Sequence, residues 1–111
     1  MNSRPNKYRA KRVVVDGYNF ASKAEARRYG ELKLMQSAGK ISGLLVHPSF
    51  LMRVVGVNYE AITYIADFSY RDRITGELVV EDVKGFKTAV YNLKKRLMRA
   101  VLGIEIKEIK A

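Results

Sequence analysis

The spacing of apolar residues predicts two helices in this chain. A first helix is predicted over residues 22–38, where apolar positions follow helical spacing up to Gly39. A second helix is predicted to begin at a Thr88 cap and to run to about Leu102, where Gly103 ends it. Both helices are therefore delimited by local capping residues as well as by their apolar pattern.

Runs of β-branched and aromatic residues predict strands around these helices. The first two runs flank Asp16-Gly17, a strong type I′ hairpin signal. The predicted strands cover residues 13–15, 18–20, 43–47, 49–55, 59–70, 77–84 and 104–109. The order hairpin, helix, strands, helix, strand predicts an α/β domain with its sheet between two helices and an N-terminal hairpin.

Three charged residues stand out in the strand-like runs of the long predicted hairpin. Asp67 lies in the first run, and Asp82 and Lys84 lie two apart in the second, so these last two share a face. If the hairpin is centred between Ile74 and Thr75, Asp67 lies opposite Asp82. Carboxylates directly across a ladder repel each other, unless a cation lies between them. Oxygen ligands of this kind suit Mg²⁺ or Mn²⁺ rather than zinc.

Solvated charges on the wet face of a hairpin are the alternative interpretation of these acids. The neighbouring residues weigh against it, because the strands are apolar on both faces. Ile65 and Val80 lie beside the acids, and Phe68 and Val83 lie on the other side. A charge inside a sheet needs a partner or a metal, which favours a site.

The same residues carry a family resemblance. The segments Ser22-Lys23-Ala24-Glu25-Ala26-Arg27-Arg28-Tyr29, Tyr64-Ile65-Ala66-Asp67-Phe68 and Val80-Glu81-Asp82-Val83-Lys84-Gly85 together resemble the PD-(D/E)xK, or restriction-endonuclease-like, nuclease superfamily. Within it, the chain is most similar to small phage-encoded proteins related to the phage endonuclease I Holliday-junction resolvases. The resemblance extends from about Lys7 to Ile109, and Ala66 stands where the superfamily motif has proline.

The resemblance implies a restriction-endonuclease-like core with a mixed sheet, and a Mg²⁺-dependent DNA endonuclease in which Mn²⁺ can substitute. It implies that Asp67, Asp82 and the carbonyl of Val83 ligate the cation, and that Lys84 stabilises the transition state. Glu25 would project from the first helix towards the metal. The implied substrate is branched DNA, and the implied assembly is a homodimer. A non-catalytic basic nucleic-acid-binding protein on a degenerate nuclease fold is the alternative function.

Glu25 has a competing structural interpretation. Ser22-x-x-Glu25 is a capping box, in which the serine hydroxyl accepts a bond from the Glu25 amide and the glutamate reaches back to the Ser22 amide. A glutamate occupied in capping cannot ligate a metal at the same moment. The sequence leaves both roles open.

Four other titratable residues are predicted to lie outside the site. Glu81 points away from Asp82 by strand alternation, onto an otherwise apolar face. A salt bridge with a helix is the one explanation for a glutamate there. His47, the only histidine, is interpreted as structural. Glu105 and Glu108 are interpreted as solvent or edge charges of the last strand.

The excess of basic residues predicts a polyanionic partner. The net charge is +10, with 21 Lys and Arg against 11 Asp and Glu, which favours phosphate neutralisation and counterion release. A solvated helix face is the alternative for any one group of these residues. The residues predicted to contact DNA are Arg4, Lys7, Arg9, Lys11 and Arg12 in a flexible basic arm over residues 1–12, and Lys23, Lys87, Lys94, Lys95 and Arg99 on or beside the helices.

The remaining composition bears on compartment. The chain has no cysteine, so disulfides and thiolate metal sites are excluded. It has no apolar run long enough to span a bilayer, and its first residues lack the apolar stretch of a signal peptide. We therefore expect a single nuclease domain over residues 13–111 in the cytoplasm, with no membrane partner. If the protein is phage-encoded, this is the cytoplasm of the host cell.

Overall fold

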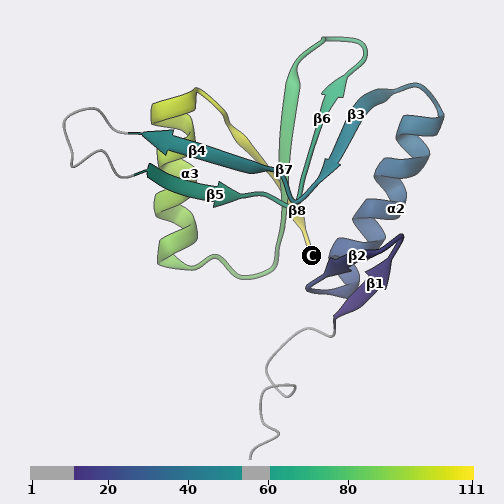
Figure 1. Cartoon of the computed structure of the whole chain (residues 1–111), viewed down its shortest axis with the longest axis horizontal. Helices are drawn as coiled ribbons and strands as arrows, with labels where there is room; N and C mark the ends of the chain where they lie inside the picture. The colour runs from purple at the N-terminus through teal and green to yellow at the C-terminus, as the bar shows by residue number, and fades with distance from the viewer. Residues whose placement is uncertain (1–11, 54–60) are drawn as a thin grey trace, which may run out of the picture.

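The computed structural model describes residues 12–53 and 61–111 of the chain, which form an α/β domain (Figure 1). Its helices are α2 (Lys23–Ser37) and α3 (Ala89–Leu102). Its strands are β1 (Val13–Val15), β2 (Tyr18–Phe20), β3 (Ile41–Val46), β4 (Ser49–Arg53), β5 (Ala61–Ile65), β6 (Phe68–Asp72), β7 (Leu78–Lys84) and β8 (Ile106–Lys110). Among these residues, no helix is long and apolar enough to cross a membrane.

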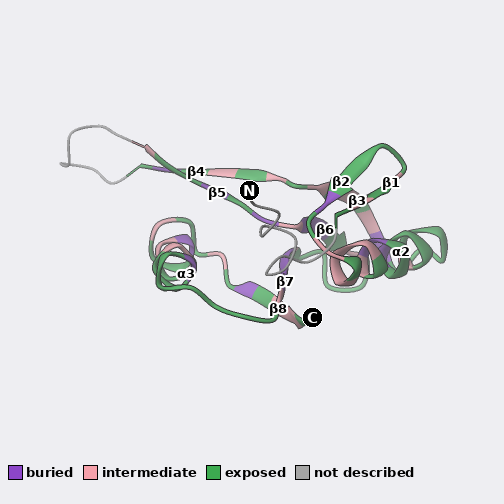
Figure 2. Ribbon diagram, turned by 90° about the horizontal axis from the view of Figure 1, so that it is seen from below, coloured by how far each residue is buried: buried purple, intermediate pink, exposed green. Residues whose placement is uncertain are grey.

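The central sheet has the strand order β3-β6-β7-β8. Its β7–β8 pair is parallel and the other two pairs are antiparallel, so the predicted mixed sheet is confirmed. Helix α3 connects the two parallel strands, as a crossover must. Helix α2 lies on one side of this sheet and α3 on the other, while the β4–β5 ribbon extends over α3 (Figures 1 and 2). The expectation of a sheet flanked by two helices is confirmed.

A separate hydrophobic cluster fills each side of the sheet. The cluster beneath α2 contains the buried residues Phe20, Tyr29, Leu32, Ile41, Phe68, Tyr70 and Val83. The cluster beneath α3 and the β4–β5 ribbon contains Met52, Tyr64, Ala66, Val80, Tyr91, Met98 and Ile106. The sheet is buried on both faces, which explains why its strands lack a simple apolar–polar alternation.

Capping residues delimit both helices as predicted. Ser22 Oγ accepts a bond from the Glu25 amide at the start of α2, and Thr88 Oγ accepts one from the Tyr91 amide at the start of α3. Helix α3 ends at Gly103, whose φ of 69° lies in the left-handed region that favours glycine. These ends are local features, and the sequence predicts them to within one residue.

Turn chemistry also fixes both predicted hairpins. Asp16 and Gly17 have φ of 53° and 81°, as a type I′ turn requires. In the longer hairpin Phe68 pairs with Glu81, so the hairpin is centred between Ile74 and Thr75, as predicted. Asp67 therefore lies across from Asp82.

The prediction of one continuous strand over residues 59–70 is wrong. The described part of this segment breaks at Ala66 and Asp67, so β5 pairs with β4 while β6 pairs with β3 and β7. The partner segment breaks at the same level, where His47 has a φ of 55°. The Ala66 amide donates to the Pro48 carbonyl oxygen (3.0 Å), and the His47 amide donates to that of Asp67 (2.9 Å). Two paired segments of the chain thus leave the sheet together and continue as a separate ribbon, β4 and β5.

The other predicted strands need small corrections. The segment predicted over 43–47 is β3, Ile41–Val46, and the last strand begins at Ile106 rather than at residue 104. Glu105 therefore precedes the last strand. The segment predicted over 49–55 ends at Arg53 in the described residues, because residues 54–60 are not described.

Candidate metal centre

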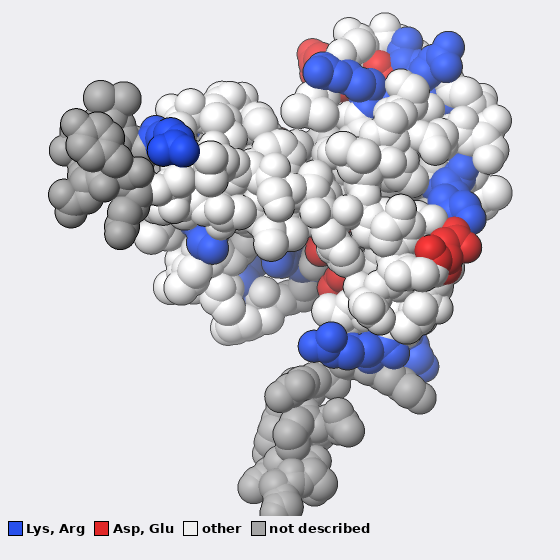
Figure 3. Space-filling model, in the orientation of Figure 1, with Lys and Arg blue, Asp and Glu red and all other residues white. Residues whose placement is uncertain are grey.

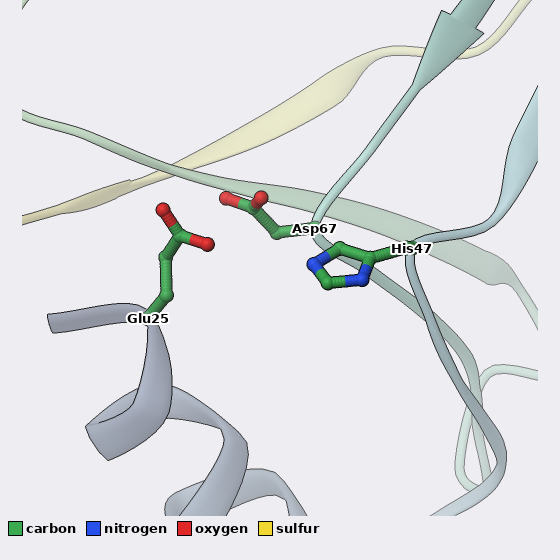
Figure 4. Close-up of side chains that lie close together, drawn as sticks. All are labelled: Glu25, His47 and Asp67. Atoms are coloured by element: carbon green, nitrogen blue, oxygen red, sulfur yellow. The ribbon is translucent and has the colours of Figure 1, made fainter. Parts of the chain in front are cut away.

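The break between β5 and β6 brings three side chains together from distant parts of the sequence. Glu25 comes from the first turn of α2, His47 from the turn between β3 and β4, and Asp67 from the break itself. One donor atom of each lies within 4.8 Å of the other two, and their side chains converge in Figure 4. Two carboxylates and an imidazole at this separation form a potential metal-binding group.

Asp82 is connected to this group by hydrogen bonds that involve Asp67. The Asp67 amide donates to Asp82 Oδ1 (3.0 Å), and Asp67 Oδ2 accepts from the Val83 amide (2.7 Å). Asp82 is only 1% exposed, yet among the described residues its Oδ2 has no hydrogen-bond partner. A buried carboxylate oxygen left unpaired is costly, so it calls for a cation or another donor.

Burial raises the pKa of all three carboxyl groups. It raises the pKa of Asp82 to about 6, against the opposing effects of the Lys84 ammonium and the Asp67 amide. Burial is also the largest cause of the raised pKa of Asp67, and the raised pKa of Glu25 follows from burial and then from the charge of Asp67. The ionised forms of the three carboxyl groups are therefore destabilised, and a divalent cation would stabilise them.

Lys84 is the basic side chain at this group of acids. Its ammonium lowers the pKa of Glu25, Asp67 and Asp82, as expected for a cation close to all three. Its Nζ lies 4.4 Å from the centroid of the Tyr91 ring, a distance at which a cation–π contact holds the ammonium. Asp82 and Lys84 thus act on one side of β7, as their spacing predicts.

The structure accommodates both interpretations of Glu25. Ser22 Oγ accepts from the Glu25 amide (3.1 Å), so the serine half of the capping box forms. The return bond is long and goes to the Ala21 amide, at 3.4 Å from Glu25 Oε1, rather than to the Ser22 amide. Most of the cap therefore depends on Ser22, and the Glu25 carboxylate faces Asp67 and His47.

His47 is the member of this candidate group that sequence reasoning left out. A lone histidine before a proline gives no chemical pattern, and its left-handed backbone cannot be read from composition. Strand pairing is the signal that could have found it. Val46 ends β3 and pairs with Phe68, which begins β6, so His47 and Asp67, just beyond these strand ends, must be neighbours.

The predicted salt bridge of Glu81 with a helix is confirmed. Arg28 of α2 donates to both carboxylate oxygens of Glu81, at 2.8 and 2.7 Å, and the Tyr70 hydroxyl donates to the same carboxylate. Glu81 is fully buried. This network connects the helix that carries Glu25 to the strand that carries Asp82.

Glu108 lies on the edge strand β8, as predicted, but it is not a solvent charge. Its side chain is 21% exposed and accepts bonds from Lys87 (2.8 Å), Lys95 (3.0 Å) and the Tyr91 hydroxyl (2.8 Å). These bonds, with that of Lys87 the largest cause, lower the pKa of Glu108 to about 2. Because β8 is parallel to β7, it brings this acid beneath α3, a contact that spacing alone does not reveal.

The residues predicted to contact DNA divide into three groups. Lys87 and Lys95 share Glu108, Lys94 donates to the Thr63 carbonyl oxygen (3.2 Å), and Arg99 lies 3.5 Å from Glu105. Arg12 and Lys23 are exposed. The residues of the predicted arm that lie outside the described residues are Arg4, Lys7, Arg9 and Lys11. On the face seen in Figure 3, acidic and basic atoms meet in the hollow between the β4–β5–α3 and α2 parts of the domain.

The extent of one sequence match decides the family. A family described as "Protein of unknown function (DUF1064)" matches residues 5–110. The chain belongs to the DUF1064 family. No curated protein and no solved structure matches this DUF1064 chain significantly. The DUF1064 description assigns no activity.

A conservative change at Glu25 separates its capping and metal-binding roles. Glu25→Gln keeps the amide that donates to Ser22 Oγ, so the melting temperature should change little. If Glu25 ligates a cation, the same change removes its charged oxygen, and Mn²⁺ affinity should fall about 10- to 100-fold. Calorimetric titration with Mn²⁺ and a thermal melt measure the two effects. A variant that binds Mn²⁺ like the wild type would make Glu25 a capping residue only.

Proposed function

We propose that this chain is a Mg²⁺-dependent DNA endonuclease with a restriction-endonuclease-like core. The observation that supports it best is the group formed by Asp67, Asp82 and Lys84, in which a buried Asp82 oxygen lacks a partner among the described residues. The mixed sheet between two helices agrees with the core that the family resemblance implies. The excess of basic residues suits a polyanionic substrate.

The donor set fits a hard divalent cation. Asp67, Asp82 and Glu25 offer carboxylate oxygens, the ligands that Mg²⁺ and Mn²⁺ prefer. His47 adds an imidazole nitrogen to the same group, which makes Mn²⁺ a good substitute. The Val83 carbonyl remains the further ligand that the resemblance implies. When bound, the cation would supply charge neutralisation at the scissile phosphate and activation of the attacking water.

Lys84 and two backbone amides would position the reacting groups. The Lys84 ammonium, held between the Tyr91 ring and the carboxylates, would donate to a phosphate oxygen as negative charge develops on it. The Asp67 amide donates to the Asp82 carboxylate and the Val83 amide donates to the Asp67 carboxylate, which fixes both carboxylates before substrate arrives. Such fixed groups need no rearrangement during the reaction, and this is the basis of electrostatic preorganisation.

Lys84 gives a direct test of this role. Lys84→Ala should lower the cleavage rate on the order of 10²-fold or more, as for loss of one electrostatic stabiliser. Lys84→Arg should restore little, because a planar guanidinium does not replace a compact ammonium packed on Tyr91. Single-turnover cleavage rates measure both variants. A fully active Lys84→Ala protein would reduce Lys84 to a surface charge.

The proposed substrate is branched duplex DNA, cut by a homodimer. One chain provides one Asp67, Asp82 and Lys84 set, so paired cuts on two strands need a second subunit. The residues proposed to hold the duplex are the basic side chains predicted to contact DNA, in the arm and on or beside the two helices. Each phosphate they neutralise should make binding weaker as salt is added.

One assay tests the activity directly. The purified protein is incubated with supercoiled plasmid, a four-way junction and a linear duplex of the same length, each with Mg²⁺, Mn²⁺ or EDTA. Metal-dependent cutting that prefers the junction is expected, and an Asp67→Asn protein prepared in parallel should be inactive. Equal cutting of junction and linear duplex would leave a nuclease without junction selectivity. Metal-independent binding without cutting would favour the non-catalytic nucleic-acid-binding alternative.

A further inference from the structure

A cavity of about 330 Å³ lies beside Lys84, and most of its lining residues take no part in the proposed chemistry. One side is formed by the end of β5 and the other by the first turns of α3, with Lys84 between them. Its volume falls at the lower end of the range for small-ligand sites. The cavity therefore adjoins the proposed catalytic lysine directly.

The cavity walls combine apolar surface with positive charge. Ile65 and Val90 line it and are 60% and 63% exposed, which leaves their side chains largely in water. Lys84 and Lys94 also line it, and Lys94 is held at the rim by its bond to the Thr63 carbonyl oxygen (3.2 Å). A ligand that covers both kinds of surface must have an apolar face and an anionic group.

Tyr64, a residue of the cavity lining, carries a buried hydroxyl that lacks a partner. Tyr64 is 4% exposed and belongs to the lining, and its hydroxyl makes no hydrogen bond within the described residues. A buried hydroxyl normally has a partner, because leaving it unpaired costs free energy. Solvent does not reach this hydroxyl, so the cavity would recognise a ligand through its apolar and positively charged walls.

We propose that this cavity binds one unpaired nucleotide of the DNA strand next to the phosphate that Lys84 contacts. This inference rests on the proposed nuclease function and deepens it. The base would lie on Ile65 and Val90, and a flanking phosphate would lie between Lys84 and Lys94. Inorganic phosphate alone would leave the apolar walls in water, so the chemistry selects a nucleotide.

The proposal has a consequence for substrate choice. A base inside a duplex is stacked on its neighbours and cannot enter a side cavity without being unstacked. Unstacking is least costly for nucleotides that are already unpaired, as at branch points and single-stranded ends. The cavity would thus favour cutting beside an unpaired nucleotide.

A titration followed by amide NMR tests the cavity without any cleavage. With EDTA present, the full chain is titrated with trithymidylate, and separately with thymidine and with inorganic phosphate. Trithymidylate should bind most tightly and shift the amides of Ile65, Lys84, Thr88 and Val90 most. Equal shifts from inorganic phosphate, or shifts spread evenly over the basic surface, would overturn the proposal.

Wall variants give the second measurement. Ile65→Ala and Val90→Ala should each weaken trithymidylate binding about fivefold, because each removes apolar contact surface. Leu34→Ala is the matched control, since Leu34 is 73% exposed on α2 and should leave affinity unchanged. Unchanged affinity in both wall variants would overturn the inference.

This test separates the cavity from the nuclease activity. Site-specific binding in EDTA without cutting in Mg²⁺ would reject the nuclease and keep the nucleotide site. Metal-dependent cutting with no selective trithymidylate binding would keep the nuclease and reject the nucleotide site.

Discussion

Asp82→Asn is expected to abolish DNA cleavage and, at neutral pH, to raise the melting temperature of the metal-free protein. The loss of activity follows from removing a charged oxygen ligand from the proposed metal site. The gain in stability follows from burial. Asp82 is 1% exposed, and its ionised form carries an oxygen without a hydrogen-bond partner among the described residues.

The pKa of Asp82 fixes the pH range of this stability effect. Burial raises that pKa from 3.8 to about 6, so the folded protein binds a proton more readily than the unfolded chain does. Stability from this group is therefore fully present below pH 3.8 and is lost as pH rises through about 6. Above that pH the ionised carboxylate destabilises the fold by on the order of 1–3 kcal/mol. The variant's advantage should be large at pH 7.5 and small at pH 4.5.

Added cation should reverse the order of stability. A ligand that binds only the folded protein raises its melting temperature by mass action, so Mg²⁺ should stabilise the wild type more than the Asp82→Asn variant. Thermal melts at both pH values, with EDTA or Mg²⁺, measure the effect beside a cleavage assay.

Asp72→Asn is the matched control for Asp82→Asn. Asp72 lies in the same hairpin, where its Oδ1 accepts from the Ile74 and Thr75 amides. Those bonds, with the one from Thr75 the largest cause, lower the pKa of Asp72, so its replacement should not stabilise the protein. Cleavage should also be unchanged in this variant. Wild-type activity in Asp82→Asn would contradict the metal-site assignment, and a lower melting temperature for it in EDTA at pH 7.5 would contradict the cost of burying the ionised carboxylate.

The parts of this fold that the sequence predicts well depend on neighbouring residues. Ser22 and Thr88 start the two helices because each hydroxyl bonds an amide three residues later. Gly103 ends the second helix because it adopts the left-handed backbone. The register that sets Asp67 across from Asp82 follows from where the turn is centred. All of these interactions lie within one helical turn or one hairpin.

The parts that the sequence did not predict depend on contacts between distant segments. The strand breaks at Asp67 because two paired segments of the chain leave the sheet together. Residue propensities alone favour a continuous strand there. His47 joins the site only because β3 pairs with β6. Glu108 reaches Lys87 and Lys95 only because β8 pairs in parallel with β7. Each of these features therefore depends on tertiary pairing rather than on local structure.

Arg28→Ala should lower the free energy of unfolding by about 3–5 kcal/mol, the cost of leaving a buried charge without its partner. Glu81 is fully buried, and Arg28 makes two charge-assisted bonds to it at 2.8 and 2.7 Å. The Tyr70 hydroxyl would remain as a donor to Glu81, but it is neutral. A loss of this size is a large fraction of the stability of a small domain. Urea unfolding followed by circular dichroism measures it.

Two further variants identify the cause. Arg27→Ala is the control, because Arg27 is exposed on the same turn of α2 and should cost within about 0.5 kcal/mol. Combining Arg28→Met with Glu81→Leu removes both charges and should recover much of the loss, as apolar replacement of buried ion pairs does elsewhere. An Arg28→Ala protein as stable as Arg27→Ala would mean that this salt bridge contributes little.

The double variant also tests whether the salt bridge positions the site. Arg28 follows Glu25 by three residues on α2, and Glu81 directly precedes Asp82 on β7. The bidentate bond thus fixes the distance between the two elements that carry these acids, whereas apolar side chains allow α2 to slide. If the salt bridge has this role, the Arg28→Met/Glu81→Leu protein should be stable yet bind Mn²⁺ more weakly than the wild type. Wild-type Mn²⁺ affinity in that protein would show that packing alone holds Glu25 in place.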